Sequence, residues 1–96
     1  MKQVNSVNDI QEDRFILKYG QEFCIPCEMT EKNLEALEND FDINFYSCMN
    51  TDESIDKGFT SLPAIILMKG THETILTDTE ILMDEDELKV WISNNI

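Results

Sequence analysis

The 96-residue sequence has few of the residues that interrupt regular structure, and it has few basic side chains. It contains only three glycines and two prolines, which excludes a collagen-like chain and a Pro- and Gly-rich disordered segment. Seven Lys and Arg residues stand against twenty Asp and Glu residues, and the resulting net charge of −13 repels phosphate backbones and anionic membrane surfaces. We therefore expect no nucleic-acid partner and no membrane partner.

Long apolar segments are also missing. The longest apolar run extends from Leu62 to Met68, which is far too short to span a bilayer, and the segment from Met1 to Asn8 lacks the apolar region of a secretory signal. A cytoplasmic protein is therefore expected. The length and the 42% apolar content predict one domain over residues 1–96 with a single modest core. We also expect a monomer.

Metal-ligating and nucleophilic side chains are scarce. The sequence has a single histidine, His72, and one histidine alone does not indicate a Ser-His-Asp catalytic triad. We expect His72 in a solvated turn. Tetrahedral zinc needs four ligands, and Cys48 and His72 form no second close pair beside Cys24 and Cys27, so no metal site is expected. In a reducing compartment a C-x-x-C pair favours redox or metal chemistry over a structural cross-link, whereas Cys48 is expected to be a packing residue.

Apolar periodicity predicts the order strand, helix, strand, helix, strand, strand, helix. A strand-helix-strand unit demands a right-handed crossover and a parallel pair, while the short turn at Gly70 demands an antiparallel pair. The fold class is therefore α/β, with a mixed four-stranded sheet sandwiched by helices. The predicted strands are residues 14–19, 43–47, 64–69 and 74–77, and the predicted helices are a brief one within 6–13, then 26–39, 51–57 and one beginning near 84.

The segment Cys24-Ile25-Pro26-Cys27 lies between a buried strand and an amphipathic helix. Free backbone N–H groups and the positive end of the helix dipole at this position favour a thiolate, which is the nucleophilic form of cysteine. Pro26 suits the first helical turn because its missing N–H is not needed there. We expect Cys24 to attack a disulfide and Cys27 to resolve the mixed disulfide.

The segment FILKYGQEFCIPCEM, followed by Ser61-Leu62-Pro63-Ala64 and Lys69-Gly70, resembles the thioredoxin family over nearly the whole chain from about residue 14. The resemblance implies a thioredoxin-like fold and a cis peptide bond before Pro63, next to the cysteine loop. It implies no cofactor. The substrate-binding residues that it implies are Phe23, Ile25, Pro26, Leu62 and Pro63.

The chain departs from the family pattern around the cysteines. Ile25-Pro26 replaces Gly-Pro, Phe23 replaces a Trp, and Lys18 stands six residues before Cys24, where the family keeps a buried Asp. Strand alternation places Lys18 on the same face as Ile16, where it either reaches the rim or approaches the cysteines as a modulator of thiol pKa. The first strand of the family is expected to be reduced or missing.

These features together predict a thiol–disulfide oxidoreductase that reduces protein disulfides. The resemblance implies a flavoprotein reductase or glutathione as the electron donor. Two alternatives remain open: a thioredoxin-fold binding module with an acidic docking surface and no turnover, and metal sequestration by Cys24, Cys27 and Cys48.

Overall fold

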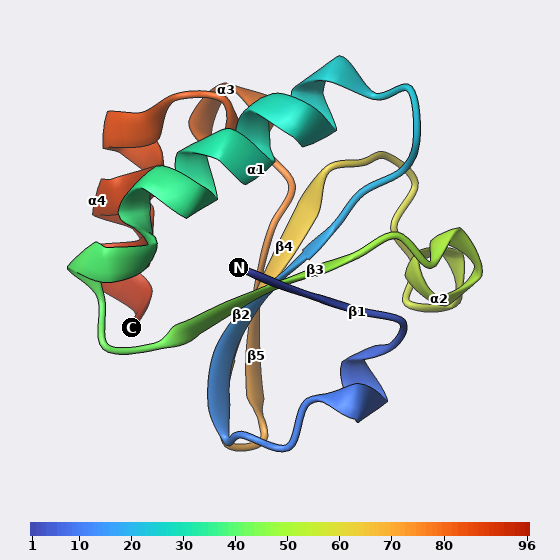
Figure 1. Ribbon diagram of the computed structural model, residues 1–96, viewed down its shortest axis with the longest axis horizontal. Coiled ribbons are helices and arrows are strands. Elements are labelled where there is room, and N and C mark those ends of the chain that lie inside the picture. Colours follow the sequence, from blue (N-terminus) through green and yellow to red (C-terminus); the bar gives the residue numbers. More distant parts are fainter.

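The computed structural model describes residues 1–96 and contains a five-stranded mixed sheet between two layers of helices (Figure 1). The strands have the order β1-β3-β2-β4-β5. They are β1 (Lys2–Val4), β2 (Arg14–Tyr19), β3 (Asn44–Cys48), β4 (Ala64–Lys69) and β5 (His72–Leu76). The helices are α1 (Ile25–Leu37), α2 (Thr51–Asp56), α3 (Thr79–Leu82) and α4 (Glu85–Asn95), with 3-10 turns η1 (Val7–Asp9) and η2 (Glu38–Asp40).

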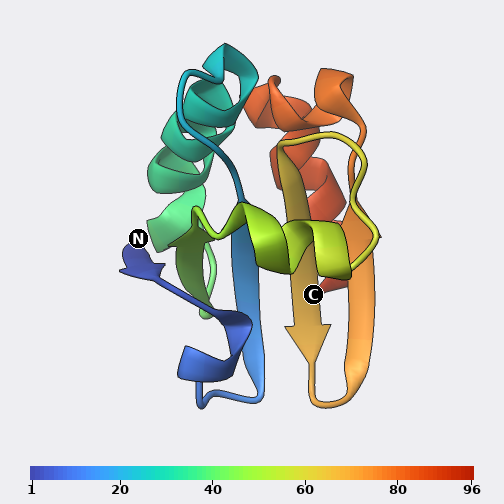
Figure 2. The ribbon, with the colours of Figure 1, turned by 90° about the vertical axis from the view of Figure 1, so that its right-hand side faces the viewer.

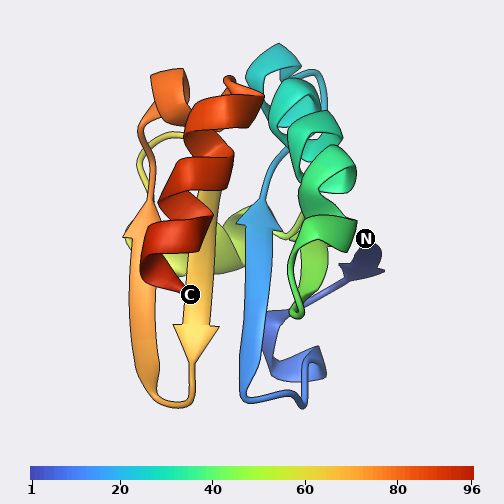
Figure 3. The same ribbon diagram turned by 90° about the vertical axis from the view of Figure 1, so that its left-hand side faces the viewer.

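Strand β2 occupies the centre of the sheet. It pairs in parallel with β3 and antiparallel with β4, and β4 continues antiparallel into β5. Helices α1, α3 and α4 lie on one face of the sheet, whereas α2 and η1 lie on the other (Figures 2 and 3). The chain leaves the C-terminal end of the central strand β2 and enters α1 after a short loop. The cysteine pair lies at this junction.

Two apolar clusters hold these layers together. The larger one includes Ile16 of β2 and Leu34 of α1 and fills the space beneath α1, α3 and α4. The smaller one includes Leu17 and Tyr19 on the opposite face of β2. Successive residues of β2 thus enter different clusters, as the period of two in a strand requires, and the strand is buried on both faces. None of the helices is long and apolar enough to cross a membrane.

The expectation of four strands is wrong because it omits β1. This strand is reduced but present: Lys2–Val4 pairs in parallel with β3 from Tyr46 to Cys48. Its three residues carry no alternating apolar pattern, so backbone pairing and tertiary contacts form it instead. The brief helix predicted within residues 6–13 is only the 3-10 turn η1, and the short helix α3 has no predicted counterpart.

Glu53 attaches the N-terminal segment to the rest of the fold. Its carboxylate accepts hydrogen bonds from the Ser6 hydroxyl, from the Val7 backbone N–H at 3.0 Å and from the Tyr19 hydroxyl at 2.7 Å. Desolvation raises the pKa of Glu53, but the hydrogen bonds from Ser6 and Tyr19 outweigh it and hold this pKa below its ordinary value. The ionised carboxylate therefore stabilises the folded state.

We predict that Glu53→Gln lowers the free energy of unfolding at neutral pH by about 1–2 kcal/mol, because neutral acceptors form weaker hydrogen bonds than carboxylates. A depressed carboxyl pKa contributes stability above the ordinary pKa of 4.5, and this contribution is lost as the pH falls through the folded-state value. The difference in the free energy of unfolding between the parent protein and Glu53→Gln should therefore shrink at acidic pH. Urea unfolding followed by Trp91 fluorescence at neutral and acidic pH measures it; an unchanged difference would contradict this role.

Candidate active site

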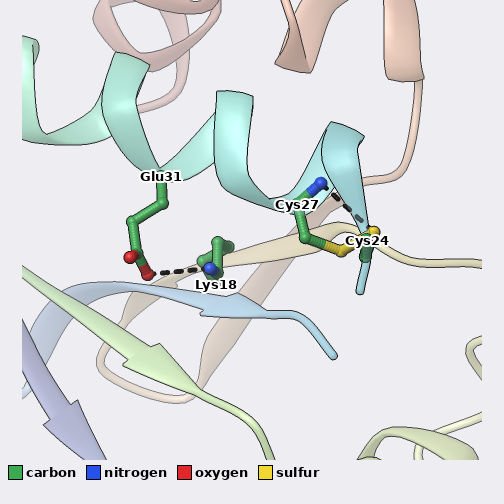
Figure 4. The surroundings of a disulfide bond; sticks show 4 residues. All are labelled: Lys18, Cys24, Cys27 and Glu31. Atoms are coloured by element: carbon green, nitrogen blue, oxygen red, sulfur yellow. Dashed lines mark hydrogen bonds and ion pairs between the residues drawn. A yellow bond between two sulfur atoms is a disulfide. The ribbon is translucent and has the colours of Figure 1, made fainter. Parts of the chain in front are cut away.

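The two cysteines of the C-x-x-C segment form a disulfide at the start of α1 (Figure 4). Cys24 is the N-cap residue of the helix, and its Sγ accepts a hydrogen bond from the Cys27 backbone N–H at 3.2 Å. Pro26 occupies the first turn, as predicted. The Cys24 sulfur therefore lies where the unpaired N–H groups and the positive end of the helix dipole favour a thiolate.

Solvent reaches the two cysteines unequally. Cys24 is 9% exposed, whereas Cys27, in the first turn of α1, is only 2% exposed. Cys24 is therefore the more accessible residue of the pair. That Cys24 attacks and Cys27 resolves stays a prediction.

Phe23 precedes the disulfide in a conformation that most side chains avoid. Its φ of 56° is in the left-handed region, and its side chain is fully exposed. Ile25, Met29 and Met49 are further exposed apolar side chains of this end of the molecule. Together with Phe23 they are four of the seven exposed large apolar residues of the chain, and we call this set the apolar collar. These side chains are therefore candidates for contact with another molecule.

Lys18 is buried and does not reach the rim of the sheet. Its side chain is 3% exposed, and its Nζ donates to Glu31 Oε1 at 2.8 Å (Figure 4). A Cβ added to Gly20 would lie 3.2 Å from Lys18 Nζ and 3.4 Å from Cys27 Cβ. Because Gly20 has no side chain, the space between Lys18 and Cys27 stays open to the lysine ammonium.

Glu31 is a site residue that the sequence reasoning missed. It follows Cys27 by four residues on α1, so the two side chains share one face of the helix, and this spacing was the available signal. The Ser47 hydroxyl also donates to Glu31 Oε1 at 2.8 Å. Desolvation raises the pKa of Glu31, but the hydrogen bonds from Lys18 and Ser47 outweigh it and lower this pKa overall. Glu31 therefore remains ionised and compensates the charge of Lys18.

A cavity of about 470 Å³ adjoins Cys27. Phe23 and Met49 of the apolar collar contribute to its walls, and so do the paired side chains of Lys18 and Glu31. Glu22 and Glu28 add two further carboxylates, with Gln3 and Gln21 completing the lining. The cysteine pair thus borders an open cavity with both apolar and charged walls.

The Leu62–Pro63 peptide bond is cis, as the resemblance implies. Pro63 is buried directly before β4, whose first residue, Ala64, pairs with Tyr19 at the end of β2. Pro63 therefore lies beside the strand that leads into the cysteine loop. Leu62 is half-buried and lines a separate, smaller hollow together with Gln21.

The remaining thiol and the histidine lie outside the site. Cys48 is fully buried at the end of β3, and burial raises the pKa of its thiol, so it stays protonated and unreactive near neutral pH. His72 is exposed on β5 rather than in the preceding turn. The chain contains no group of three or more His, Cys, Asp or Glu side chains arranged to hold a metal ion.

No protein-family model matches the sequence, and no curated protein matches it. Solved structures do match. Oxidised mitochondrial thioredoxin 3 from Saccharomyces cerevisiae has a TM-score of 0.78 and 17% identity, over 98% of this chain and 94% of that one. A mutant thioredoxin from Halobacterium salinarum has a TM-score of 0.77 and 22% identity, over 96% and 87%. Thioredoxin f2 from Chlamydomonas reinhardtii has a TM-score of 0.77 and 15% identity, over 99% and 95%.

The chain therefore has the thioredoxin fold, as the sequence predicts. A C-x-x-C disulfide at the start of a helix on this fold supports, at the level of the class, a thiol–disulfide oxidoreductase.

We predict that Phe23→Asn raises the free energy of unfolding of the oxidised protein by about 1 kcal/mol, because left-handed backbone costs an ordinary side chain about that much and asparagine tolerates it. The fully exposed ring gives up no buried contact in exchange. Urea unfolding with the disulfide intact measures the change. A clear loss of stability would show that the ring supports the fold instead of a surface for contact.

Proposed function

We propose that this protein reduces protein disulfides through Cys24 and Cys27. The observation that carries the proposal is the Cys24–Cys27 disulfide at the N-terminus of α1, in which Cys24 is the more exposed cysteine and has the exposed side chains of Phe23 and Ile25 on either side of it in the chain. A structural disulfide would not need exposed apolar side chains around it. A disulfide that must receive another polypeptide would need them.

The reaction begins from the reduced dithiol. The Cys24 thiolate attacks one sulfur of the substrate disulfide; that bond breaks, and the other substrate sulfur leaves as a thiolate and takes up a proton. Cys27 then loses its proton and attacks Cys24 Sγ. This step releases the second substrate thiol and leaves the Cys24–Cys27 disulfide that the structure contains. Two electrons have passed from the protein to the substrate.

An external donor must return these two electrons. A flavoprotein reductase or glutathione fits this role, and the protein needs no cofactor of its own because its two sulfurs carry the electrons. We place the protein in the cytoplasm, where a reducing poise keeps such a pair in use, and propose that it acts as a monomer.

The substrate polypeptide would contact the residues that surround Cys24. Phe23, Ile25 and Pro26 lie next to it in the chain, and Phe23 and Ile25 offer exposed apolar area. Leu62 and Pro63 lie on the segment that enters β4 beside the end of β2. We propose that these five residues receive an extended stretch of substrate, with Met29 and Met49 widening the apolar surface.

We predict that Cys24→Ser abolishes the reduction of a protein disulfide such as insulin, whereas Cys27→Ser accumulates a mixed disulfide with the substrate. The reason is the order of attack, since only Cys24 starts the reaction and only Cys27 completes it. Mass spectrometry under non-reducing conditions detects the trapped adduct. Equal alkylation of both thiols at neutral pH would contradict the assignment. An absence of turnover in the unmodified protein would favour a binding module with an acidic docking surface.

Lys18 is a positioning residue in this proposal, since it acts on the thiols through its charge. The buried ammonium beside Cys27 favours a thiolate in the dithiol form, and Glu31 holds it in place. A lysine thus stands at the position where the resemblance implies a buried acid.

We predict that Lys18→Met raises the pKa of the reactive thiols by about one unit, because it removes a buried cation from the neighbourhood of Cys27. Ultraviolet absorbance of the thiolate, titrated against pH, measures the shift. Lys18→Arg keeps the charge and should keep more of the native titration, which separates charge from packing. Superimposable titration curves for Lys18→Met and the parent protein would limit Lys18 to a structural role.

A further inference from the structure

The cavity beside Cys27 has walls of two chemical kinds. Phe23 and Met49 give it apolar area next to the disulfide, while Glu22 and Glu28 bring carboxylates from the cysteine loop and from the first turn of α1. Its volume of about 470 Å³ is large enough for one long side chain of a bound polypeptide. The cavity is therefore placed to contact a residue close to a substrate disulfide.

The residues that line this cavity carry more negative than positive charge: Lys18 is the one cation, against Glu22, Glu28 and Glu31. Lys18 and Glu31 neutralise one another at 2.8 Å. Glu22 and Glu28, in contrast, have no ion-pair partner within 4 Å, although Lys32 lies four residues beyond Glu28 on the same helix. Two exposed carboxylates in the lining of a partly apolar cavity thus have no cationic partner.

The acidic residues at this site differ in what the fold requires of them. Glu28 lies in the first turn of α1, where a negative charge also stabilises the helix dipole. Glu22 belongs to the loop between β2 and α1, and its side chain has no hydrogen bond within the protein. Glu28 therefore has a partial role in stabilising the fold, whereas Glu22 has no structural role that its contacts show.

We propose that this cavity binds a lysine or arginine side chain that lies next to the substrate disulfide, so that the protein prefers disulfides in basic sequence. The methylene stem of such a side chain packs against Phe23 and Met49, and its cationic head reaches Glu22 and Glu28. The net charge of −13 attracts the same substrates from a distance. This inference rests on the proposed disulfide reductase function and names its substrate class.

The test uses three synthetic peptides, each with one disulfide, that differ only in the residue following a cysteine: Lys, Gln or Glu. We expect kcat/KM for the Lys peptide to exceed that for the Glu peptide by about fivefold at low salt, the effect of one or two exposed ion pairs. The ratio should fall toward one at about 1 M salt, where charges are screened beyond about 3 Å.

Two variants locate the preference. Glu22→Gln with Glu28→Gln should bring the Lys-to-Glu peptide ratio close to one, and using a ratio within each variant cancels any change in thiol reactivity. The matched control is Glu80→Gln with Glu85→Gln, which removes the same charge from α3 and α4, outside the cavity. It should keep most of the preference. Equal loss in both double variants would assign the effect to overall charge and overturn the site.

An uncharged small disulfide, hydroxyethyl disulfide, separates failure of this inference from failure of the proposed function. Turnover of that compound with equal rates for the three peptides would overturn the cationic site and leave the reductase function standing. No turnover of hydroxyethyl disulfide or of any peptide would overturn the reductase function and the inference with it.

Discussion

The start of α1 is the constraint on which the site depends. Cys24 is the N-cap residue, its sulfur accepts the Cys27 N–H, and the same sulfur is half of the disulfide. One atom therefore caps the helix and, in the proposed function, attacks the substrate disulfide. Strand β2 is buried on both faces and paired on both sides, so its end is held in one place. The short loop that follows β2 therefore fixes the position of Cys24. The position of the Cys24 sulfur is therefore set by the core of the protein.

The surroundings of the disulfide show how a charged group is accommodated in a small domain. Lys18 is buried in a central strand, and a lysine there would be costly without a partner. Gly20 supplies the space for its ammonium, and Glu31 supplies the opposite charge from the neighbouring helix. The collar residue Phe23 adds local backbone strain and exposed apolar area. The buried Lys18 and the strained Phe23 are both costly to the folded state, and both lie near the cysteines. Strained residues of this kind cluster at functional sites in proteins.

Much of the fold follows from the sequence because its main elements have strong local patterns. The apolar run of β2, the helical spacing in α1 and the C-x-x-C pair between them are enough to place the cysteines at a helix start. Strand β1 escapes prediction because three residues carry no periodicity and pair only through the tertiary structure. The alternation of β2 gives the face of Lys18 but not its partner, since the contact with Glu31 depends on how α1 crosses the sheet. The left-handed backbone of Phe23 likewise has no signal in its residue type.

The central claim is that the Cys24–Cys27 disulfide is redox-active and is not a structural cross-link. Equilibration of the protein with glutathione redox buffers, followed by acid trapping and mass spectrometry, measures the reduction potential of the pair directly. We predict that the pair is oxidised and reduced reversibly by two electrons, with a potential between about −270 and −120 mV, the range of proteins that exchange disulfides. A disulfide that does not equilibrate, or that has a potential below about −300 mV as structural cross-links do, would contradict it.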